Sequence, residues 1–263
     1  MSELESAIIV ENLIKHFFIR HHGYSIKGAL MGGVKRAVKG KSVEELHALK
    51  GISFTVPHGQ TLAVIGWNGS GKSTLLGILA RVYKPTSGRA TLFNRSGGKA
   101  RLAPLLALEA GFHPELSGLE NIYFYGSLLG LSRAELAARE EEIVAFAELG
   151  AKIDTQMHSW NDGAKLRLGF SIAIHTDPDI ILVDEVLAVG DEAFQNKCFR
   201  RIRELQTLGK TIVFVSHDLA VVEKVATRVI WLNQGVIEQD GTAHEVLPLY
   251  RNAAQVVALI APD

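Results

Sequence analysis

The stretch of residues 66–74, GWNGSGKST, constrains this chain more than any other part of it. It fits the pattern G-x-x-x-x-G-K-[ST], in which glycines let the backbone turn tightly and approach a polyphosphate without a Cβ clash. The apolar run at residues 61–65 predicts a buried parallel strand before the loop, and residues 73–82 carry apolar side chains at helical spacing after it. A strand, this loop and a helix in that order predict a site for nucleotide phosphates at the start of the helix.

The residue types of the loop also predict individual roles. Lys72 is expected to reach the β- and γ-phosphates, and Ser73 is expected to ligate Mg²⁺. The backbone N–H groups of the loop are expected to point at the phosphates. The predicted nucleotide-binding residues of the loop are Gly66, Asn68, Gly69, Ser70, Gly71, Lys72, Ser73 and Thr74.

Apolar runs and helical patterns alternate along the rest of the chain, which predicts an α/β fold class with a parallel sheet. Residues 118–177 are helical in pattern throughout and predict a helical lobe inserted between core strands. The other expected strands are 48–56, 90–93, 180–183 and 211–215, with an edge strand at 7–10 and a hairpin at 228–232 and 236–240. The expected helices are 120–129, 133–149, 163–175, 192–208 and 219–225.

Composition limits the classes of partner. The chain has 263 residues, of which 47% are hydrophobic, which allows a substantial core in one large domain or in one domain with a lobed insertion. Its formal net charge is zero, so no general attraction to nucleic acid is expected. The single cysteine, Cys198, fits a reducing compartment and is expected to be a buried core thiol. No apolar stretch approaches the length of a membrane span, so any contact with a membrane is expected to be indirect.

Residues 20–42 differ from the rest of the chain because they are basic and contain no acidic residue. Apolar residues recur there every four positions, which is compatible with a short amphipathic helix. Two interpretations stay open: a solvated insertion, or a contact with lipid headgroups or an anionic substrate group. The basic residues are Arg20, Lys27, Lys35, Arg36, Lys39 and Lys41.

Three expected strands end in groups suited to phosphate chemistry. Residues 61–65 lead to the glycine-rich loop, residues 180–183 lead to Asp184 and Glu185, and residues 211–215 lead to Ser216 and His217. Active groups of open α/β sheets gather at the carboxyl ends of the strands. We expect Asp184 to hold Mg²⁺ through water, Glu185 to polarise the attacking water, and His217 to hydrogen-bond a γ-phosphate.

With these residues in this order, the chain resembles the ATPase subunits of ABC transporters from about residue 8 to residue 250. The resemblance implies a P-loop ABC ATPase core with a helical subdomain and an N-terminal antiparallel β element, and it implies ATP as the nucleotide. Phe17 would stack on the adenine, and Asp191 would end a loop that meets the second nucleotide site. The resemblance further implies a head-to-tail homodimer beneath two transmembrane permease subunits, at the cytoplasmic face of the plasma membrane.

Within that family the chain is most similar to bacterial exporters of polysaccharides such as O-antigen, capsule and teichoic acid. The basic insertion and the segments at residues 110–122 and 184–191 carry this similarity. We expect residues 1–250 to form the ATPase domain and residues 251–263 a tail. Some O-antigen members have an additional C-terminal carbohydrate-binding domain, and none is expected here because the chain stops at Asp263.

Two segments depart from the family pattern. Between Arg101 and Gly118 there is no glutamine, which most ABC ATPases place at the entry to the helical lobe. Glu109 is the nearest candidate for its role and could ligate Mg²⁺ or water.

The second departure concerns the signature segment, which here reads WNDGA at residues 160–164. Asn161 and Gly163 would meet the partner subunit's nucleotide, and Asn161 or Asp162 suits a helix N-cap. An anion about 4 Å from a γ-phosphate costs on the order of 4 kcal/mol per charge pair near a surface. Either the dimer closes poorly, Asp162 turns away, or a cation intervenes.

These observations support three hypotheses. The first is the ATP-driven subunit of a polysaccharide exporter, and the second is a subunit that assembles but hydrolyses ATP poorly because of Asn161 and Asp162. The third is a soluble ABC protein of translation or DNA repair. Proteins of that third kind usually carry tandem cassettes or a long coiled coil, and this chain has neither.

Overall fold

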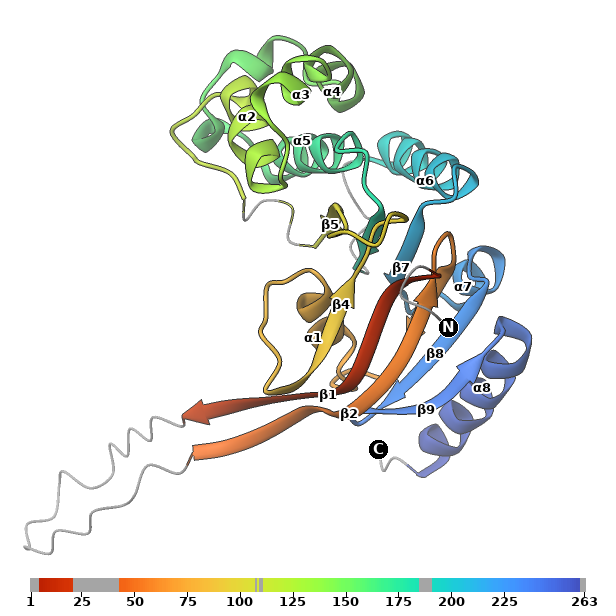
Figure 1. The fold of residues 1–263 in the computed structure, drawn as a ribbon. Helices are drawn as coiled ribbons and strands as arrows, with labels where there is room; N and C mark the ends of the chain where they lie inside the picture. The colour runs from red at the N-terminus through yellow and green to blue at the C-terminus, as the bar shows by residue number, and fades with distance from the viewer. Residues whose placement is uncertain (1–4, 21–42, 107, 109–110, 185–190, 261–263) are drawn as a thin grey trace, which may run out of the picture.

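The computed structural model describes residues 5–20, 43–106, 108, 111–184 and 191–260. Two β-sheets form the body of the molecule, and a helical lobe lies at one end of it (Figure 1). Most of the basic segment, from residue 21 to residue 42, lies outside the described residues, so the short helix considered there stays a prediction.

The larger sheet has the strand order β5-β6-β7-β3-β8-β9 and is parallel except for its last pair. The strands β3, β6 and β7 are buried at every residue, as their continuous apolar sequences predict. β5 was not expected from the sequence because it has only four residues and contains a proline. The strands are β3 (Thr61–Ile65), β5 (Leu102–Leu105), β6 (Ile180–Val183), β7 (Thr211–Val215), β8 (Arg228–Asn233) and β9 (Val236–Gly241).

The smaller sheet is antiparallel, with the order β2-β1-β4. Its strands are β1 (Ser6–Arg20), β2 (Val43–Pro57) and β4 (Ser87–Leu92). The prediction of an edge strand at residues 7–10 was wrong, because β1 is longer and lies in the middle of this sheet. Its backbone pairs with β2 on one side and β4 on the other, and both strands lie far from it in the sequence, so no local pattern identifies them. Beyond Ile14, β1 pairs only with β2.

The core has two layers. One cluster lies between the two sheets and includes the buried leucines of α1 (Lys72–Leu79). The other covers the opposite face of the larger sheet, where α5 (Asp162–Ile174), α6 (Glu192–Thr207), α7 (Leu219–Val225) and α8 (Ala243–Ile260) pack. Cys198 of α6 is fully buried there, and burial raises the pKa of its thiol to about 12, which confirms the core-thiol prediction.

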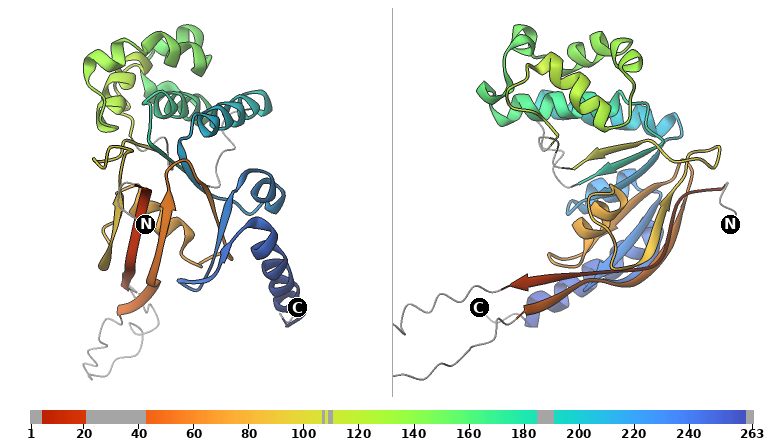
Figure 2. Two further views of the ribbon diagram at one scale, coloured as in Figure 1. Left: turned by 45° about the vertical axis from the view of Figure 1, so that its right-hand side comes forward. Right: turned by 60° about the vertical axis from the view of Figure 1, so that its left-hand side comes forward.

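The helical lobe lies to one side of the sheets (Figure 2), and its buried apolar residues form a separate cluster. The predicted helix at residues 133–149 is in fact two helices, α3 and α4, separated at Ala138 and Arg139. Glu140, Glu141 and Glu142 fill the first turn of α4, where carboxylates are stabilised by the positive end of a helix. The lobe contains α2 (Gly118–Leu128), α3 (Arg133–Ala137), α4 (Glu140–Ala147), the 3₁₀ turns Gly150–Asp154 and Met157–Ser159, and α5 (Asp162–Ile174).

The C-terminal helix α8 crosses the expected domain boundary at residue 250 without a break and continues to Ile260. It packs beside β8, β9 and α7. The expected tail is therefore helical as far as Ile260. Among the described residues, no helix has both the length and the apolar character needed to cross a membrane.

Candidate functional site

The three strand ends predicted to carry the site lie next to one another. In the larger sheet β7 lies between β3 and β6, and all three strands run parallel. Val215 pairs with Val64 and Phe214 pairs with Val183, so the three strands end at the same edge. The edge therefore brings together the glycine-rich loop, Asp184 and His217.

Glycines are required at two positions of the loop. Gly66 has φ 151°, and a Cβ there would lie 2.2 Å from the carbonyl oxygen of Leu232. Gly71 has φ 105°, and a Cβ there would lie 2.5 Å from the carbonyl oxygen of Ala48. The loop is thus pressed against β8 on one side and β2 on the other, which no side chain at these positions would permit.

A further backbone contact holds the loop in place. The Gly235 N–H, from the β8–β9 turn, donates to the carbonyl oxygen of Ser70 over 3.0 Å. The carbonyl oxygen of Gly235 in turn accepts from the Lys50 N–H over 2.9 Å. The loop shape is therefore supported by two segments that are distant in sequence.

Lys72 lies inside the loop that precedes it. Its Nζ donates to the carbonyl oxygens of Gly66 over 2.8 Å and Trp67 over 3.0 Å, and the residue is only 6% exposed. An ammonium group that is surrounded by the loop backbone can form charge-assisted hydrogen bonds with an anion bound in the loop. Contact of Lys72 with the β- and γ-phosphates stays a prediction.

The start of α1 is chemically open to an anion. Gly71 caps this helix and has no side chain that could accept from the first N–H groups, and no acidic residue lies in the first turn. Ser70 is 3% exposed, and its Oγ makes no hydrogen bond within the described part of the chain. A buried hydroxyl beside a helix N-terminus fits a phosphate oxygen as its partner. The residues present therefore fit a bound nucleotide.

The predicted metal and catalytic groups are only partly described. Asp184 follows β6 directly and is half-buried, and Ser73 lies in the first turn of α1 and is exposed. Both residues follow strands that end at the same edge of the sheet, β3 for Ser73 and β6 for Asp184, and hydroxyl and carboxylate oxygens suit a Mg²⁺ ion held beside a phosphate. Glu185 and Glu109 lie outside the described residues, so their predicted roles stay predictions.

His217 is exposed and follows β7 in a short turn. The Asp218 N–H donates to the Oγ of Ser216 over 3.0 Å, and the Asp218 carboxylate accepts from the Ala220 and Val221 N–H groups at the start of α7. The residues on both sides of His217 are thus hydrogen-bonded, and this fixes the backbone of His217 at the strand-end edge.

The signature segment begins α5 one residue earlier than predicted. Asn161 is the N-cap, and its Oδ1 accepts from the Ala164 N–H over 2.9 Å, while Gly163 lies in the first turn. The Asp162 side chain is 79% exposed, and its Oδ1 lies 3.3 Å from the Nζ of Lys165. The Lys165 ammonium thus lies beside the Asp162 carboxylate, although an exposed pair of this kind contributes at most about 1 kcal/mol. Which of the three outcomes holds in a closed dimer stays a prediction.

Asp191 connects two helices. Its Oδ1 caps α6 by accepting from the Phe194 N–H over 2.9 Å, and its Oδ2 accepts from the Nη2 of Arg167 in α5 over 2.7 Å. Arg167 also lies over the Phe194 ring, with 4.6 Å between its Cζ and the ring centroid. The sequence analysis missed Arg167; the one available signal was a cation among the apolar residues of α5.

Phe17 lies on β1, half-buried and edge-to-face with Tyr83, at 5.7 Å between ring centroids. The Nζ of Lys15 lies 4.7 Å from the centroid of the Phe17 ring. The contacts with Tyr83 and Lys15 are enough to explain why the Phe17 ring packs where it does. Stacking of Phe17 on an adenine stays a prediction.

Trp67 of the glycine-rich loop belongs to an aromatic cluster that the sequence analysis also missed. Its ring centroid lies 5.5 Å from that of Trp231 on β8 and 5.6 Å from that of Tyr250 on α8. Such ring contacts contribute roughly 0.5–1.5 kcal/mol each beyond their buried area. The cluster joins the phosphate loop to the C-terminal helix.

Comparison with known proteins agrees with this geometry. The family model for ABC transporters matches residues 49–188. An O-antigen export system ATP-binding protein RfbB of Klebsiella pneumoniae is 43% identical over 251 residues, which cover 95% of this chain and 99% of that protein. A protein of the same name from Myxococcus xanthus is 41% identical, and the match covers 96% of this chain but only 57% of that protein.

More distant relatives and solved structures follow the same pattern. A teichoic acids export ATP-binding protein TagH of Bacillus cereus is 38% identical over 78% of this chain and 36% of its own length. An ATP-binding subunit of an ABC transporter has a TM-score of 0.71 at 20% identity, with 93% of each chain covered. A dimeric cassette in a post-hydrolysis state with ADP and Pi has a TM-score of 0.67 at 23% identity, covering 90% of this chain and 98% of its own, and both structures show the shared fold. This chain belongs to the ABC transporter family, as an ATP-binding cassette.

Proposed function

We propose that this chain is the ATP-hydrolysing subunit of a bacterial ABC exporter for a lipid-linked polysaccharide of the O-antigen, capsule or teichoic acid type. The observation that carries the proposal is the strand-end edge, where the Lys72 ammonium, the open start of α1 and Asp184 come together. The K. pneumoniae relative, which matches over nearly the full length of both chains, supports the class of cargo.

In this proposal the loop residues Gly66 to Thr74 bind the phosphates of ATP, with Lys72 opposite the β- and γ-phosphates. Ser73 and Asp184 hold Mg²⁺, which neutralises phosphate charge, and Glu109 adds a ligand or orients water. Glu185 polarises the attacking water, and His217 hydrogen-bonds the γ-phosphate. Phe17 stacks on the adenine.

The site is completed by a second copy of the chain. Asn161 and Gly163 at the start of α5, together with Asp191, meet the nucleotide bound by the partner in a head-to-tail homodimer. The dimer works beneath two transmembrane permease subunits at the cytoplasmic face of the plasma membrane. Residues 20–42 are the part of the chain that would contact the membrane or an anionic group of the cargo.

One observation favours a second candidate function. Asp162 is 79% exposed at the end of α5 that would face the partner's γ-phosphate, and Lys165 offsets its charge only in part. A subunit that binds ATP and assembles with its permease, but closes and hydrolyses slowly, would have this arrangement.

The test is phosphate release by the chain reconstituted in lipid vesicles with its permease subunits, measured for the wild type and Glu185→Gln. We expect the wild type to release phosphate and the variant to bind Mg-ATP normally but release little phosphate, because an amide cannot polarise water as a carboxylate does. Slow release by the wild type with normal ATP binding favours the second candidate.

The cargo is tested separately, by surface staining for polysaccharide in cells that lack the gene and in cells complemented with the wild type or Glu185→Gln. Restored surface polysaccharide with the wild type alone is the expected result. Restoration by both would contradict ATP hydrolysis as the driving step, and restoration by neither would contradict the export of polysaccharide.

A further inference from the structure

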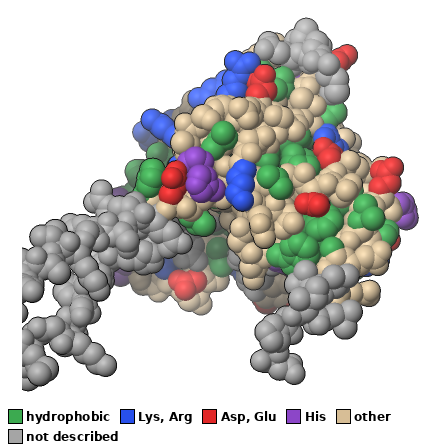
Figure 3. Space-filling view, turned by 90° about the horizontal axis from the view of Figure 1, so that it is seen from below, with side chains coloured by type: hydrophobic (Ala, Val, Ile, Leu, Met, Phe, Trp, Pro, Cys, Tyr) green, Lys and Arg blue, Asp and Glu red, His purple; other side chains and the backbone are tan. Residues whose placement is uncertain are grey.

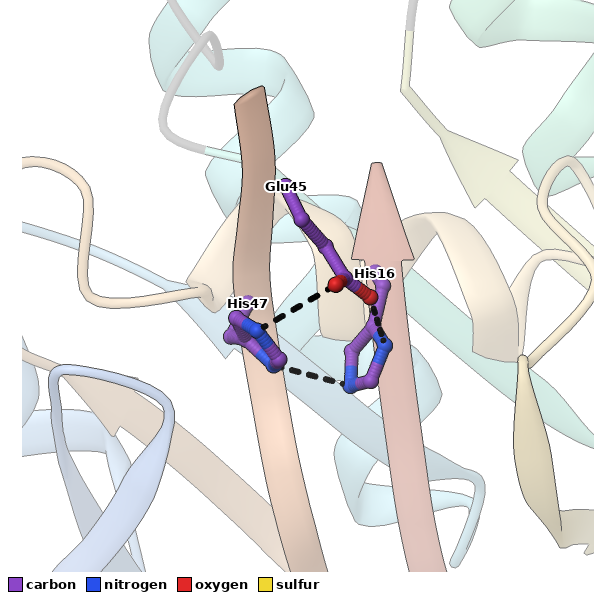
Figure 4. Close-up of side chains that lie close together, drawn as sticks. All are labelled: His16, Glu45 and His47. Carbon is purple, nitrogen blue, oxygen red and sulfur yellow. Dashed lines mark hydrogen bonds and ion pairs between the residues drawn. The ribbon is translucent and has the colours of Figure 1, made fainter. Parts of the chain in front are cut away.

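Three metal-binding side chains meet on the ribbon that β1 and β2 form beyond the rest of the smaller sheet. His16 comes from β1, and Glu45 and His47 come from β2 (Figure 4). His16 pairs directly with His47 in the strand register, and Glu45 lies two residues from His47 along the same strand. The pleat of the strands therefore places all three side chains on one face.

The donor atoms are close enough to share one ion. The Nδ1 of His16 lies 2.8 Å from Oε1 of Glu45, and the Nδ1 of His47 lies 3.0 Å from the Nε2 of His16. The Nε2 of His47 lies 3.9 Å from Oε2 of Glu45. The first two of these distances use different nitrogens of His16, but one donor atom from each of the three side chains lies within 4.8 Å of the others. In a tetrahedral zinc site with bonds of about 2.0–2.1 Å, ligand atoms lie roughly 3.3 Å apart, so the three side chains would turn to bring one donor each onto the ion.

The chemistry and the access both suit a transition metal. Two imidazoles and one carboxylate are a ligand set found in zinc sites that keep an open position for water. The side chains are 23%, 42% and 47% exposed for His16, Glu45 and His47, so solvent and ions can reach them. Seen from below, histidine and acidic side chains lie next to each other on the surface of the molecule (Figure 3).

The position of the cluster indicates what a metal would do. β4 pairs with β1 only from Ile8 to Ile14, and beyond Ile14 the ribbon has two strands (Figure 1). This part of the ribbon exposes Phe18 by 69% and Leu46 by 49%. A two-stranded ribbon is marginally stable in water, so a link between its strands would stabilise it.

We propose that His16, Glu45 and His47 bind a divalent transition metal ion, zinc in the first instance, which clamps β1 to β2 at the base of the basic segment. His16 is next to Phe17 in β1, and successive side chains of a strand point to opposite faces, so the cluster lies on the other face of the ribbon from Phe17. The proposal does not depend on the proposed transport function. Without a metal, the same groups form a hydrogen-bonded chain from Glu45 through His16 to His47.

The test uses the full-length chain without an affinity tag, stripped of metal with a chelator and free of nucleotide. Titration with Co²⁺ is followed by visible absorption, and Zn²⁺ affinity is measured by calorimetry. We expect a saturable site in the wild type and at least about tenfold weaker zinc binding in His47→Gln and in Glu45→Gln. The exposed His158, in the helical lobe, provides the matched control, and His158→Gln is expected to bind as the wild type does.

Hydrogen exchange provides a readout on the ribbon itself. Zinc is expected to slow amide exchange in residues 15–20 and 43–47 of the wild type, and to leave these residues of His47→Gln unchanged. Circular dichroism confirms that each variant is folded. The proposal would be overturned if the wild type showed no saturable zinc binding, or if the wild type and both variants bound zinc with equal affinity. The three side chains would then form only the hydrogen-bonded chain from Glu45 through His16 to His47.

Discussion

Arg167 of α5 donates from Nη2 to Oδ2 of Asp191 over 2.7 Å, and this contact joins the helix of the signature segment to the N-cap of α6. The Arg167 side chain is 19% exposed, and its Nη1 also lies 3.7 Å from Oε2 of Glu148 at the end of α4. One side chain thus connects the helical lobe to the segment that follows the strand-end edge. In the proposed dimer, both ends of this contact would belong to the surface that meets the partner's nucleotide.

We expect Arg167→Ala to destabilise this junction. The loss of the ion pair and of the contact with Phe194 costs about 1 kcal/mol, which lowers Tm by about 2–4 °C in a chain of this size. ATP binding by the isolated chain should be unchanged, and phosphate release by the assembled transporter should fall. Thermal unfolding and phosphate-release assays measure the two effects. The exposed Arg203 on α6 provides the control, and equal Tm values for Arg203→Ala and Arg167→Ala would contradict the structural role.

Lys72→Ala should weaken Mg-ATP binding. The ammonium makes charge-assisted hydrogen bonds, and the loss of roughly 1.5–3 kcal/mol corresponds to an affinity about 10- to 100-fold lower. Calorimetric titration with Mg-ATP measures this change. Lys99→Ala, at an exposed position outside the loop, should bind as the wild type does. Unchanged affinity in Lys72→Ala would contradict the assignment of the nucleotide site.

The double change Asn161→Ser and Asp162→Ser should raise phosphate release at least several-fold, which corresponds to about 1 kcal/mol in the barrier. Removing the Asp162 carboxylate removes the repulsion of the partner's γ-phosphate. Serine also caps helices about as well as asparagine does, so α5 should keep its start. The assay uses the assembled transporter with wild type and double variant side by side. Equal rates would mean that Lys165 already neutralises Asp162 or that the acid points away in the closed dimer.

The contact between Glu135 and Arg101 should make the helical lobe sensitive to acid. Hydrogen bonds from Ser132 and the adjacent Arg101 guanidinium lower the pKa of Glu135 from 4.5 to about 2. A carboxylate with a lowered pKa stabilises the fold above the ordinary pKa, and this contribution is lost as the pH falls toward 2.

We therefore expect Glu135→Gln to unfold at a lower Tm than the wild type at pH 7. Glutamine retains the capping geometry but cannot pair with Arg101, so the variant isolates the charge. The difference in Tm should stay constant down to about pH 5 and narrow below 4.5. Thermal unfolding of both proteins across this pH range is the measurement, and a difference that does not narrow would show that the charge of Glu135 is not the cause.

Local features of the chain could be predicted because local physics decides them. The apolar run before the glycine-rich loop is β3 at the predicted residues, and Asn161 caps α5 as its residue type favours. The split of residues 133–149 into two helices was not predicted. The apolar side chains keep helical spacing through both helices, so the spacing gives no sign that one helix ends and another begins. The three glutamates that start α4 are equally compatible with the exposed face of one continuous helix.

The sequence by itself determined the order of strand, phosphate loop and helix, the two other strand ends with Asp184 and His217, and the resemblance to the ABC transporter family. Each of these depends on residues next to one another in the chain. Only the tertiary structure decided that β1 is a central strand, that Arg167 reaches Asp191, and that His16 faces His47. Those partners lie 24 and 31 residues apart in the chain, and their contacts depend on strand register and helix packing, which no local pattern encodes.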